Sequence, residues 1–488
     1  MKVTAPLVLV LILVAAAVPA GGPLEPSVLR VRVTRQNYDY LRPWQKQEPE
    51  LVGGLGVVLA PDRILVPGGL LANATLVEVE RISDGSRCEA VVECADYAAN
   101  LGLVRPLDEG FARSLKPVRV GELAKRGDRV STVQFEGNGT PRVSEGTIIA
   151  TEMGLPPGAR GSFLVYRVSI DLELGNTGIT PFFRRGRLIG LMVGYDSSAR
   201  TAVLIPSPVI RHFLDDIADG SYGGFPVAGF LTATIRDPQF RRYLGMANGE
   251  PGVYVAQVLP GGPAAKAGLQ AGDVLVRLDR FAIDRHGQYE DPDYGPIALS
   301  HLISTRRQVG DEISCLVFRD GGNVELTMSL DRMPVEQFPV PPYEIDRPPR
   351  FAIVGGFVFQ QLTGQIFAIW GDEWQSKAPR RLTRLEREQW ETRQPGEQIV
   401  ILTRTLPTPE NIGYENLAFL PVETVNGKPV KSMADLVQAI RSAGPVEYHQ
   451  VSFAESDAPD LFIPAATLDL ADRFVRERYG IPRLSQLD

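Results

Sequence analysis

The sequence predicts a multidomain, mainly β protein. Its 488 residues exceed the length at which one hydrophobic core keeps growing, so we expect two to four domains. The 48 glycines and 39 prolines favour short strands and many turns over long helices. Apolar residues make up 44% of the chain and charged residues 22%, which is the composition of an ordinary soluble globular protein.

The first stretch, MKVTAPLVLVLILVAAAVPAGG, has one positive charge, Lys2, followed by an apolar run. Val18 and Ala20 occupy the −3 and −1 positions of a signal-peptidase cleavage point. We therefore expect residues 1–20 to be a secretory signal peptide cut after Ala20, and the protein to be exported to the periplasm, cell envelope or medium. The alternative is an uncleaved membrane anchor, although the apolar run is short for a span of about 20 residues.

Residues 28–219 consist of short β-type runs, such as VLRVRVT, GLGVVLA and TAVLIP, separated by Gly, Pro and Asp. Helical periodicity is nearly absent until SPVIRHFLDDIADG. This pattern predicts an all-β barrel or sandwich closed by one helix. Cys88 and Cys94 fall about 20 Å apart on one expected strand, whereas a disulfide needs Cα atoms within roughly 7 Å. We expect no bridge between them.

Residues 222–332 contain GVYVAQVLPGGPAAKAGLQAGDVLVRLD, in which a strand, a Gly-rich turn, a short Ala-rich helix and a second strand follow one another. This order resembles a PDZ domain. Residues 333–350 carry six prolines and predict a stiff, extended linker.

Residues 351–488 repeat the order of strand, turn and helix in VETVNGKPVKSMADLVQAIRSAG. Ser432 and Asp435 form a variant of the capping box at the start of this helix. The expected apolar face of the helix comprises Met433, Leu436, Val437 and Ile440. We expect a second, degenerate PDZ-like module that serves domain packing or assembly, with a C-terminal helix near residues 468–479.

Together these segments resemble the HtrA/Deg (Do-like) family of serine proteases, in particular its plant-type branch. The phrases that carry the resemblance are NYDYLRPWQ, RILVPGGLLANATLVEV, VSIDLELGNTGITPFF, AVLIPSPVIRHFL, IALSHLISTRR, FAIVGGFVFQQLTGQ, ILTRTLPTPENIGYENL and the GIPRLS tail. The resemblance implies a chymotrypsin-like double β-barrel followed by two PDZ-like α+β modules.

That family carries a Ser-His-Asp triad, and all three positions differ in this chain. Gly69 occupies the His position in ILVPGGLL, Asn100 the Asp position in NLGLV, and Thr177 the Ser position in GNTGITP. Gly175 and Asn176 remain from the loop that shapes the oxyanion site. We expect the bulk of Ile179 to occlude part of that pocket.

No replacement base is evident from the sequence. A hydroxyl nucleophile needs a base within hydrogen-bond reach, and a threonine that uses its own amino group must be N-terminal, which Thr177 is not. His212 is expected on the closing helix, remote from Thr177. Asp96 lies near the Asn100 position, but as an acid it has no imidazole to orient.

The sequence implies no cofactor and no metal, because the histidines and cysteines lack ligand spacing and no phosphate-loop motif is present. A net charge of −7 without a basic patch argues against nucleic acid as a partner. A membrane partner is expected only if the signal peptide stays uncleaved.

By resemblance, the first PDZ module takes peptides or unfolded segments as an added strand, and backbone amides in PVAGF hold the terminal carboxylate. The residues that this implies are Gly229, Phe230, Leu231, Thr232 and Ala233 on the loop and edge strand, with His301 and Leu302 on the opposing helix. A solvated helix position is the alternative for His301, and ordinary core is the alternative for Phe230 and Leu231.

We expect an exported protease homologue that has lost its triad and acts as a peptide-binding scaffold or chaperone-like quality-control protein. Two alternatives remain open: an active serine-type endopeptidase with a non-standard site at Thr177, and a regulatory subunit of an active HtrA protease. The resemblance also implies a homo-oligomer.

Overall fold

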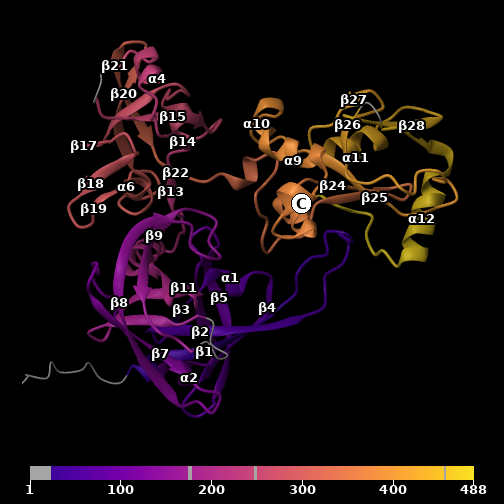
Figure 1. The fold of residues 1–488 in the computed structure, drawn as a ribbon. Helices are drawn as coiled ribbons and strands as arrows, with labels where there is room; N and C mark the ends of the chain where they lie inside the picture. Colours follow the sequence, from indigo (N-terminus) through magenta and orange to yellow (C-terminus); the bar gives the residue numbers. More distant parts are fainter. Residues whose placement is uncertain (1–23, 174–178, 247–249, 456–457, 488) are drawn as a thin grey trace, which may run out of the picture.

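The structure is a computed structural model that describes residues 24–173, 179–246, 250–455 and 458–487. The expected signal peptide lies outside these residues, as do Gly175, Asn176 and Thr177. Two closed β-barrels, a PDZ-like module, a connecting segment and a second PDZ-like module follow one another along the chain (Figure 1). The predicted mainly β architecture is confirmed.

The first barrel is closed because its first strand pairs on both edges. In the strand order β1-β2-β3-β6-β5-β4, Val31 lies opposite Gly54 of β2 and opposite Val79 of β4. Closure leaves no open edge for unwanted pairing. The elements are η1 (Glu25–Ser27), β1 (Val28–Arg35), β2 (Glu50–Ala60), β3 (Arg63–Val66), α1 (Gly68–Leu71), β4 (Ala74–Arg81), β5 (Arg87–Asp96), β6 (Leu101–Pro106) and α2 (Glu109–Ser114).

The second barrel, in the order β10-β11-β12-β9-β8-β7, is followed by the single helix that the sequence predicted. This helix buries Val209, Ile210 and Phe213 against the barrel. The elements are β7 (Arg129–Phe135), β8 (Pro141–Gly154), β9 (Phe163–Ser169), β10 (Pro181–Arg184), β11 (Arg187–Asp196), β12 (Thr201–Pro206) and α3 (Ser207–Asp216). Cys88 and Cys94, both on β5, are free thiols, as expected.

The first PDZ-like module is a sheet in the order β14-β15-β16-β20-β21, with β17 on β16 and two small ribbons, β13-β22 and β18-β19. Strand β14 therefore forms an edge of the main sheet. The elements are β13 (Pro226–Val227), β14 (Phe230–Ala233), α4 (Pro238–Tyr243), β15 (Val253–Val258), α5 (Pro263–Lys266), β16 (Val274–Leu278), β17 (Phe281–Ala282), β18 (Gln288–Asp291), β19 (Gly295–Ala298), α6 (Ser300–Ser304), β20 (Glu312–Arg319), β21 (Gly322–Ser329) and β22 (Asp331–Arg332).

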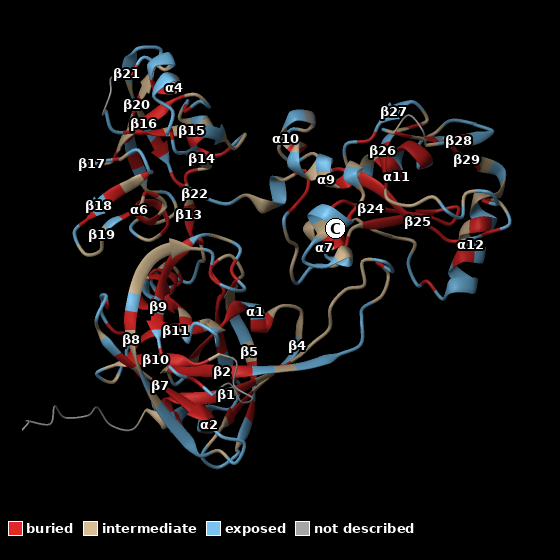
Figure 2. Ribbon diagram, viewed as in Figure 1, coloured by how far each residue is buried: buried red, intermediate tan, exposed pale blue. Residues whose placement is uncertain are grey.

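One apolar core runs from the second barrel into this module (Figure 2). It contains Phe163 and Phe213 of the barrel together with Phe225 and Val253 of the module. The rings of Phe163 and Phe225 meet edge to face, with centroids 4.9 Å apart. The module is therefore fixed on the barrel by the same burial that stabilises each part.

The proline-rich connection is docked rather than free. Asp346 Oδ1 accepts the Asn73 N–H at 2.6 Å, and the Asp346 N–H donates to Asn73 Oδ1 at 3.1 Å. Tyr97 also donates its hydroxyl to Asp346, and Val340 is buried. Composition predicted a stiff spacer, but paired polar contacts with the first barrel hold this segment in place; its one regular turn is η2 (Val335–Gln337).

The second PDZ-like module is built on a sheet in the order β29-β28-β26-β25-β24-β23-β30. Ser432 Oγ accepts the Asp435 N–H at 3.0 Å, and the four predicted apolar positions of α11 are buried. The elements are β23 (Phe351–Val354), β24 (Phe357–Gln361), α7 (Gly364–Phe367), η3 (Ala368–Trp370), α8 (Trp374–Lys377), α9 (Arg380–Arg387), α10 (Gln389–Thr392), β25 (Val400–Thr405), β26 (Leu420–Val425), β27 (Lys428–Pro429), α11 (Met433–Arg441), β28 (Tyr448–Phe453), β29 (Leu461–Pro464), η4 (Ala465–Thr467), α12 (Leu468–Tyr479) and β30 (Ser485–Gln486).

The long loop between β1 and β2, residues 36–49, reaches from the first barrel to the second module (Figure 1). Gln360 Nε2 donates to the Tyr40 carbonyl at 3.0 Å, and the Arg404 guanidinium donates to the Leu41 carbonyl at 3.2 Å. Trp44 packs on an apolar cluster of the second module. No helix among the described residues is long and apolar enough to cross a bilayer.

We predict that Trp44→Ala frees this loop. Losing the indole contact should cost about 1–2 kcal/mol of docking free energy, which corresponds to roughly tenfold faster limited trypsin cleavage after Lys46. Leu41→Ala is the matched control, because Leu41 is exposed and contributes its carbonyl to the contact. Equal cleavage rates in both variants would show that the indole does not hold the loop.

Candidate functional site

The structure brings together two of the three positions that the resemblance assigns to the triad. Gly69, in α1, donates its N–H to Asn100 Oδ1 at 2.7 Å, and Asn100 Nδ2 donates to the Pro157 carbonyl at 3.0 Å. Asn100 is 5% exposed and has a φ of 56°, a left-handed conformation that asparagine tolerates. Both ends of its amide are therefore engaged, and the neighbouring position at Gly69 carries no side chain.

The third position, Thr177, lies outside the described residues, but its neighbour Ile179 is placed. A Cβ on Gly54 of β2 would lie 3.9 Å from Ile179 Cδ1 and 3.5 Å from Leu70 Cδ2. Ile179 therefore lies near α1, the helix that carries Gly69. Its expected occlusion of the oxyanion pocket stays a prediction.

Asp96 is engaged by the connection to the first PDZ-like module. Its carboxylate accepts the Ala99 N–H at 2.7 Å and the hydroxyl of Tyr222. Burial raises the pKa of Asp96 above its ordinary value, although these hydrogen bonds oppose the shift. Asp96 thus joins the barrel to the segment after α3.

None of the four histidines, all within the described residues, is hydrogen bonded to Asn100 or Gly69. His212 Nε2 lies 2.8 Å from the Arg307 carbonyl, and its ring stacks on Phe225. As expected, His212 lies on the closing helix; the structure shows that it faces the PDZ-like module.

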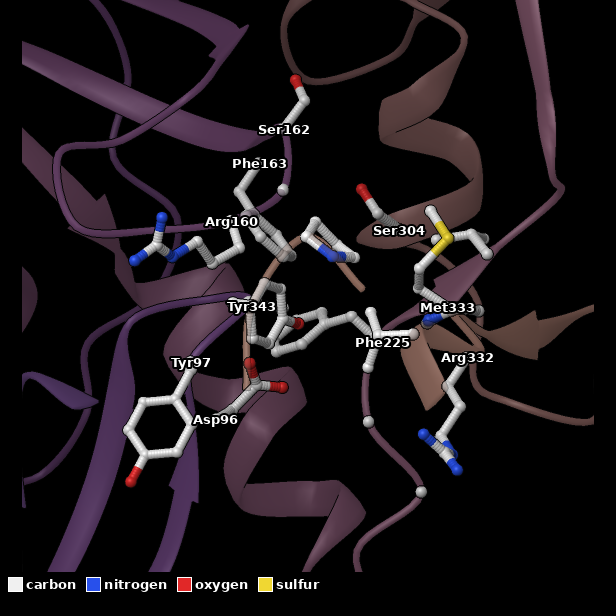
Figure 3. A pocket seen from close by; sticks show the side chains of 18 of the residues that line it. Asp96, Tyr97, Arg160, Ser162, Phe163, Phe225, Ser304, Arg332, Met333 and Tyr343 are labelled. Carbon is white, nitrogen blue, oxygen red and sulfur yellow. The ribbon is translucent and has the colours of Figure 1, made fainter. Parts of the chain in front are cut away.

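A cavity of about 610 Å³ lies where the first barrel, the second barrel, the PDZ-like module and the connecting segment meet (Figure 3). Its lining includes Asp96, Arg160, Phe225, Arg332 and Tyr343. The Arg160 guanidinium lies over the Tyr343 ring. Sequence reasoning missed this cavity, because its walls come from segments far apart in the chain.

The expected peptide edge of the first PDZ-like module is open. Strand β14 pairs with β15 on one side, and Leu231 is 63% exposed, with Thr232 and Ala233 also exposed. Gly229 has a φ of 77°, and its carbonyl accepts the Leu259 N–H at 2.8 Å. This glycine turns the chain into the edge strand, and capture of a carboxylate by the PVAGF amides stays a prediction.

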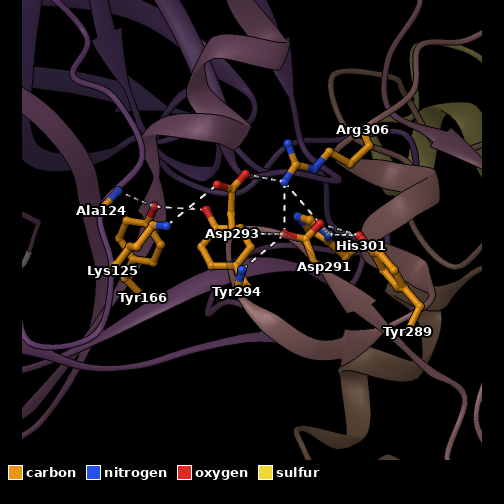
Figure 4. A network of polar contacts seen from close by, with 9 residues as sticks. All are labelled: Ala124, Lys125, Tyr166, Tyr289, Asp291, Asp293, Tyr294, His301 and Arg306. Atoms are coloured by element: carbon orange, nitrogen blue, oxygen red, sulfur yellow. Dashed lines mark hydrogen bonds and ion pairs between the residues drawn. The ribbon is translucent and has the colours of Figure 1, made fainter. Parts of the chain in front are cut away.

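The two residues expected on the opposing helix, His301 and Leu302, lie inside the module and are 1% and 3% exposed. The Tyr289 hydroxyl donates to Asp291 at 2.8 Å and lies 2.6 Å from His301 Nδ1, so that nitrogen carries the proton and donates to Tyr289 (Figure 4). Burial lowers the pKa of His301 to about 4, against the opposing effect of Asp291. Ligand contact by His301 stays a prediction, but its ring already has a partner.

The network around His301 also reaches the second barrel (Figure 4). Arg306 donates to both oxygens of Asp291 at 3.1 Å, and the hydroxyls of Tyr294 and Tyr166 lie 3.3 Å apart. Helix α6 contacts β9 of that barrel. His301 itself packs between Tyr289 and Tyr294 of the module, so the solvated position considered for it is not observed.

The second PDZ-like module differs at the matching edge. Strand β23 pairs along the whole of β24, from Phe351 opposite Gln360 to Val354 opposite Phe357, and β30 adds beyond it. The Gly355 N–H in the two-residue turn donates to Asp472 of α12 at 2.8 Å. Strand β23 therefore covers the edge of β24. The Gly-Gly pair between two apolar runs is the sequence signal that indicates such a hairpin.

Comparisons with known proteins support the assignment of these parts. A family model described as PDZ domain matches residues 340–486, and another matches residues 254–288. Protease Do-like 2, chloroplastic, of Arabidopsis thaliana is 28% identical over 421 residues, which cover 85% of this chain and 67% of the relative. The chain is similar to the HtrA/Do-like family of serine proteases with PDZ domains.

Other members of this family match at similar levels. Protease Do-like 4, mitochondrial, of Arabidopsis thaliana is 23% identical over 85% of this chain and 77% of the relative. A probable periplasmic serine endoprotease DegP-like of Ectopseudomonas mendocina is 26% identical over 60% of this chain and 59% of its own. The solved structure of an HtrA-type protease AlgW variant with a decapeptide shares the fold, with a TM-score of 0.50 and 21% identity over 63% of this chain and 95% of its own.

We predict that Asn100→Asp destabilises this chain by about 1–3 kcal/mol at pH 8, because a carboxylate oxygen would face the Pro157 carbonyl in a buried site. Thermal unfolding followed by circular dichroism measures the loss, which should shrink at pH 4, where a protonated carboxyl can donate. Asn138→Asp is the control, because exposed Asn138 uses its oxygen to accept the Thr140 N–H. Equal losses in both variants would contradict the role of the Pro157 contact.

We predict that Asp472→Asn stabilises the second module at pH 8. Burial raises the pKa of Asp472 from 3.8 to about 6. The folded state therefore favours the protonated carboxyl. Its contribution to the free energy of unfolding is fully present below pH 3.8, the unfolded pKa, and is lost as pH rises through about 6. The asparagine still accepts the Gly355 N–H without a charge, so the difference between variant and parent should close at pH 4.

Tryptophan fluorescence reads this effect selectively, because the four tryptophans, Trp44, Trp370, Trp374 and Trp390, lie in or against the second module. Glu477→Gln removes the same charge from an exposed position of the same helix. A melting difference that is independent of pH would contradict the prediction for Asp472.

Proposed function

We propose that this chain is an HtrA/Do-like protease homologue that has lost its catalytic triad and acts as a peptide-binding scaffold or chaperone-like quality-control protein. The observation that carries the proposal is the contact between Gly69 and Asn100. At this point a working triad needs an imidazole held by a carboxylate. In this chain a backbone N–H donates to an amide oxygen at 2.7 Å, and neither group accepts a proton at neutral pH.

The chemistry of the remaining groups supports the same conclusion. Thr177 needs a base to take its proton, and the histidines are hydrogen bonded elsewhere or, like His286, exposed on the PDZ-like module. Loss of triad function costs about 10⁶ in rate in related chemistry. An active endopeptidase with a site at Thr177 would have to recover that factor without an adjacent imidazole.

Peptide binding, unlike catalysis, is supported by an exposed surface of the first PDZ-like module. The open edge of β14 offers backbone groups to an extended peptide, and the turn at Gly229 lies where a terminal carboxylate would be held. One related solved structure is described as an HtrA-type protease with a decapeptide. The second module, with its matching edge covered by β23, serves packing and assembly in this proposal.

We propose further that the protein is exported and forms homo-oligomers. Support for export comes from the apolar N-terminal run and from a periplasmic DegP-like relative; other relatives are named as chloroplastic or mitochondrial. The proposal for oligomers rests on the family resemblance.

The test is cleavage of a fluorescently labelled unfolded protein by residues 21–488 and by the Thr177→Ala variant. We expect no turnover in either, because both carry Gly69 at the position of the triad imidazole, while both bind peptides with free C-termini. Turnover that disappears in Thr177→Ala would overturn the loss of activity and restore the endopeptidase alternative. Turnover in both would indicate a contaminating protease, which a serine-hydrolase probe identifies by its mass.

A further inference from the structure

The open edge of β14 leads to a second cavity, of about 780 Å³, at the end away from Gly229. Thr234, which directly follows β14, lines it together with Arg236 and Arg241 from the segment after the strand and with Arg285 and His286 from the loop before β18. The loop that carries Arg285 lies beside the strand, since a Cβ on Gly287 would be 3.6 Å from Thr232 Oγ1. The cavity therefore continues the path of a peptide added to β14.

The cavity is basic in a chain whose net charge is −7. Arg236 and Arg285 are exposed, and neither forms an ion pair with a carboxylate among the described residues; the Arg285 Nε donates to His286. Asp284, on the same wall, accepts the N–H groups of His286 and Gln288, each at 2.8 Å. Its charge is thus already stabilised by its own loop.

The other charged groups at this cavity have partners. Arg241 is 8% exposed and donates to the Glu250 carbonyl. Glu250 also lines the cavity. Arg236 and Arg285 are therefore the two exposed cations of the lining that remain for a ligand.

The geometry sets which ligand positions they meet. A peptide added to β14 runs antiparallel to it, with its terminal carboxylate at the turn around Gly229. At ~3.3 Å per residue, the side chains that reach beyond Ala233 to Thr234 and Arg236 belong to residues about four to six before the terminus.

We propose that the first PDZ-like module selects peptides with acidic residues about four to six positions before the C-terminal carboxylate, and that Arg236 and Arg285 determine this specificity. This inference rests on the proposed peptide-binding function and names the ligand class for the same site. Two partly exposed ion pairs are worth about 0.2–1 kcal/mol each, which corresponds to roughly tenfold in affinity together.

The test uses three pools of fluorescein-labelled decapeptides and the full chain. The last four positions are randomised over Val, Leu, Ile, Phe and Ala, and the three positions before them are all Glu, all Ala or all Lys. By fluorescence anisotropy at about 50 mM salt, we expect the Glu pool to bind roughly tenfold more tightly than the Ala pool, and at about 0.5 M salt only about twofold, because salt screens exposed charges.

Variants separate the two arginines from general charge. Arg236→Ala combined with Arg285→Ala should remove the advantage of the Glu pool and leave binding of the Ala pool unchanged. Arg242→Ala is the matched control, because Arg242 is an exposed arginine of α4 that does not line the cavity. It should keep the preference for Glu.

Two outcomes overturn the inference in different ways. Equal, measurable binding of the Glu and Ala pools, or a preference for Lys, would refute the acidic selectivity and leave the proposed peptide-binding function intact. Absence of binding by all three pools would refute both. A preference for Glu that survives the double arginine variant would remove Arg236 and Arg285 as its cause.

Discussion

The apolar core that the second barrel shares with the first PDZ-like module is the interaction on which the rest of the structure depends. Phe163 and Phe225 meet within it, and Tyr222, three residues before Phe225, donates to the buried Asp96 of the first barrel. Because the module is fixed in this way, α6 faces the barrel and the β14 edge faces solvent. The core thus decides which surface of the module is available for binding.

The two PDZ-like modules share a succession of strands but differ in whether the corresponding strand is exposed at the edge of the sheet. In the first, β13 pairs with β22 and leaves β14 exposed as an edge. In the second, two glycines close a tight hairpin, so β23 covers β24 and the C-terminal strand extends the sheet. A change in the length and pairing of one turn therefore converts a peptide edge into the interior of a sheet.

Much of this could be predicted from the sequence, because the informative patterns are local. Strand alternation, the closing helix α3 and the cap at Ser432 each depend on residues that are neighbours in the chain. The proposed loss of the triad likewise rests on three short phrases of the sequence. The contact between Gly69 and Asn100 agrees with that alignment, although the residues are 31 positions apart.

Features that depend on packing between segments far apart in the chain could not be predicted from the sequence. A solvated position was one alternative for His301, yet its ring is buried beside Tyr289 and Tyr294. The connecting segment has the composition of a free spacer, but Asn73 binds Asp346 from 273 residues away. Hydrogen-bond partners at such separations leave no periodicity or spacing in the chain.

Because residues 36–49 bind the second module, the domains form a closed circuit, in which the last domain along the chain contacts a loop of the first. The first barrel leads to the second barrel, then to the first module and through the docked connection to the second module, which returns to the first barrel by binding this loop. In an open string of domains, each could swing about its own hinge. In a circuit, movement at one joint must be accommodated at the others or break a contact, so a peptide bound at one module is mechanically linked to every other domain.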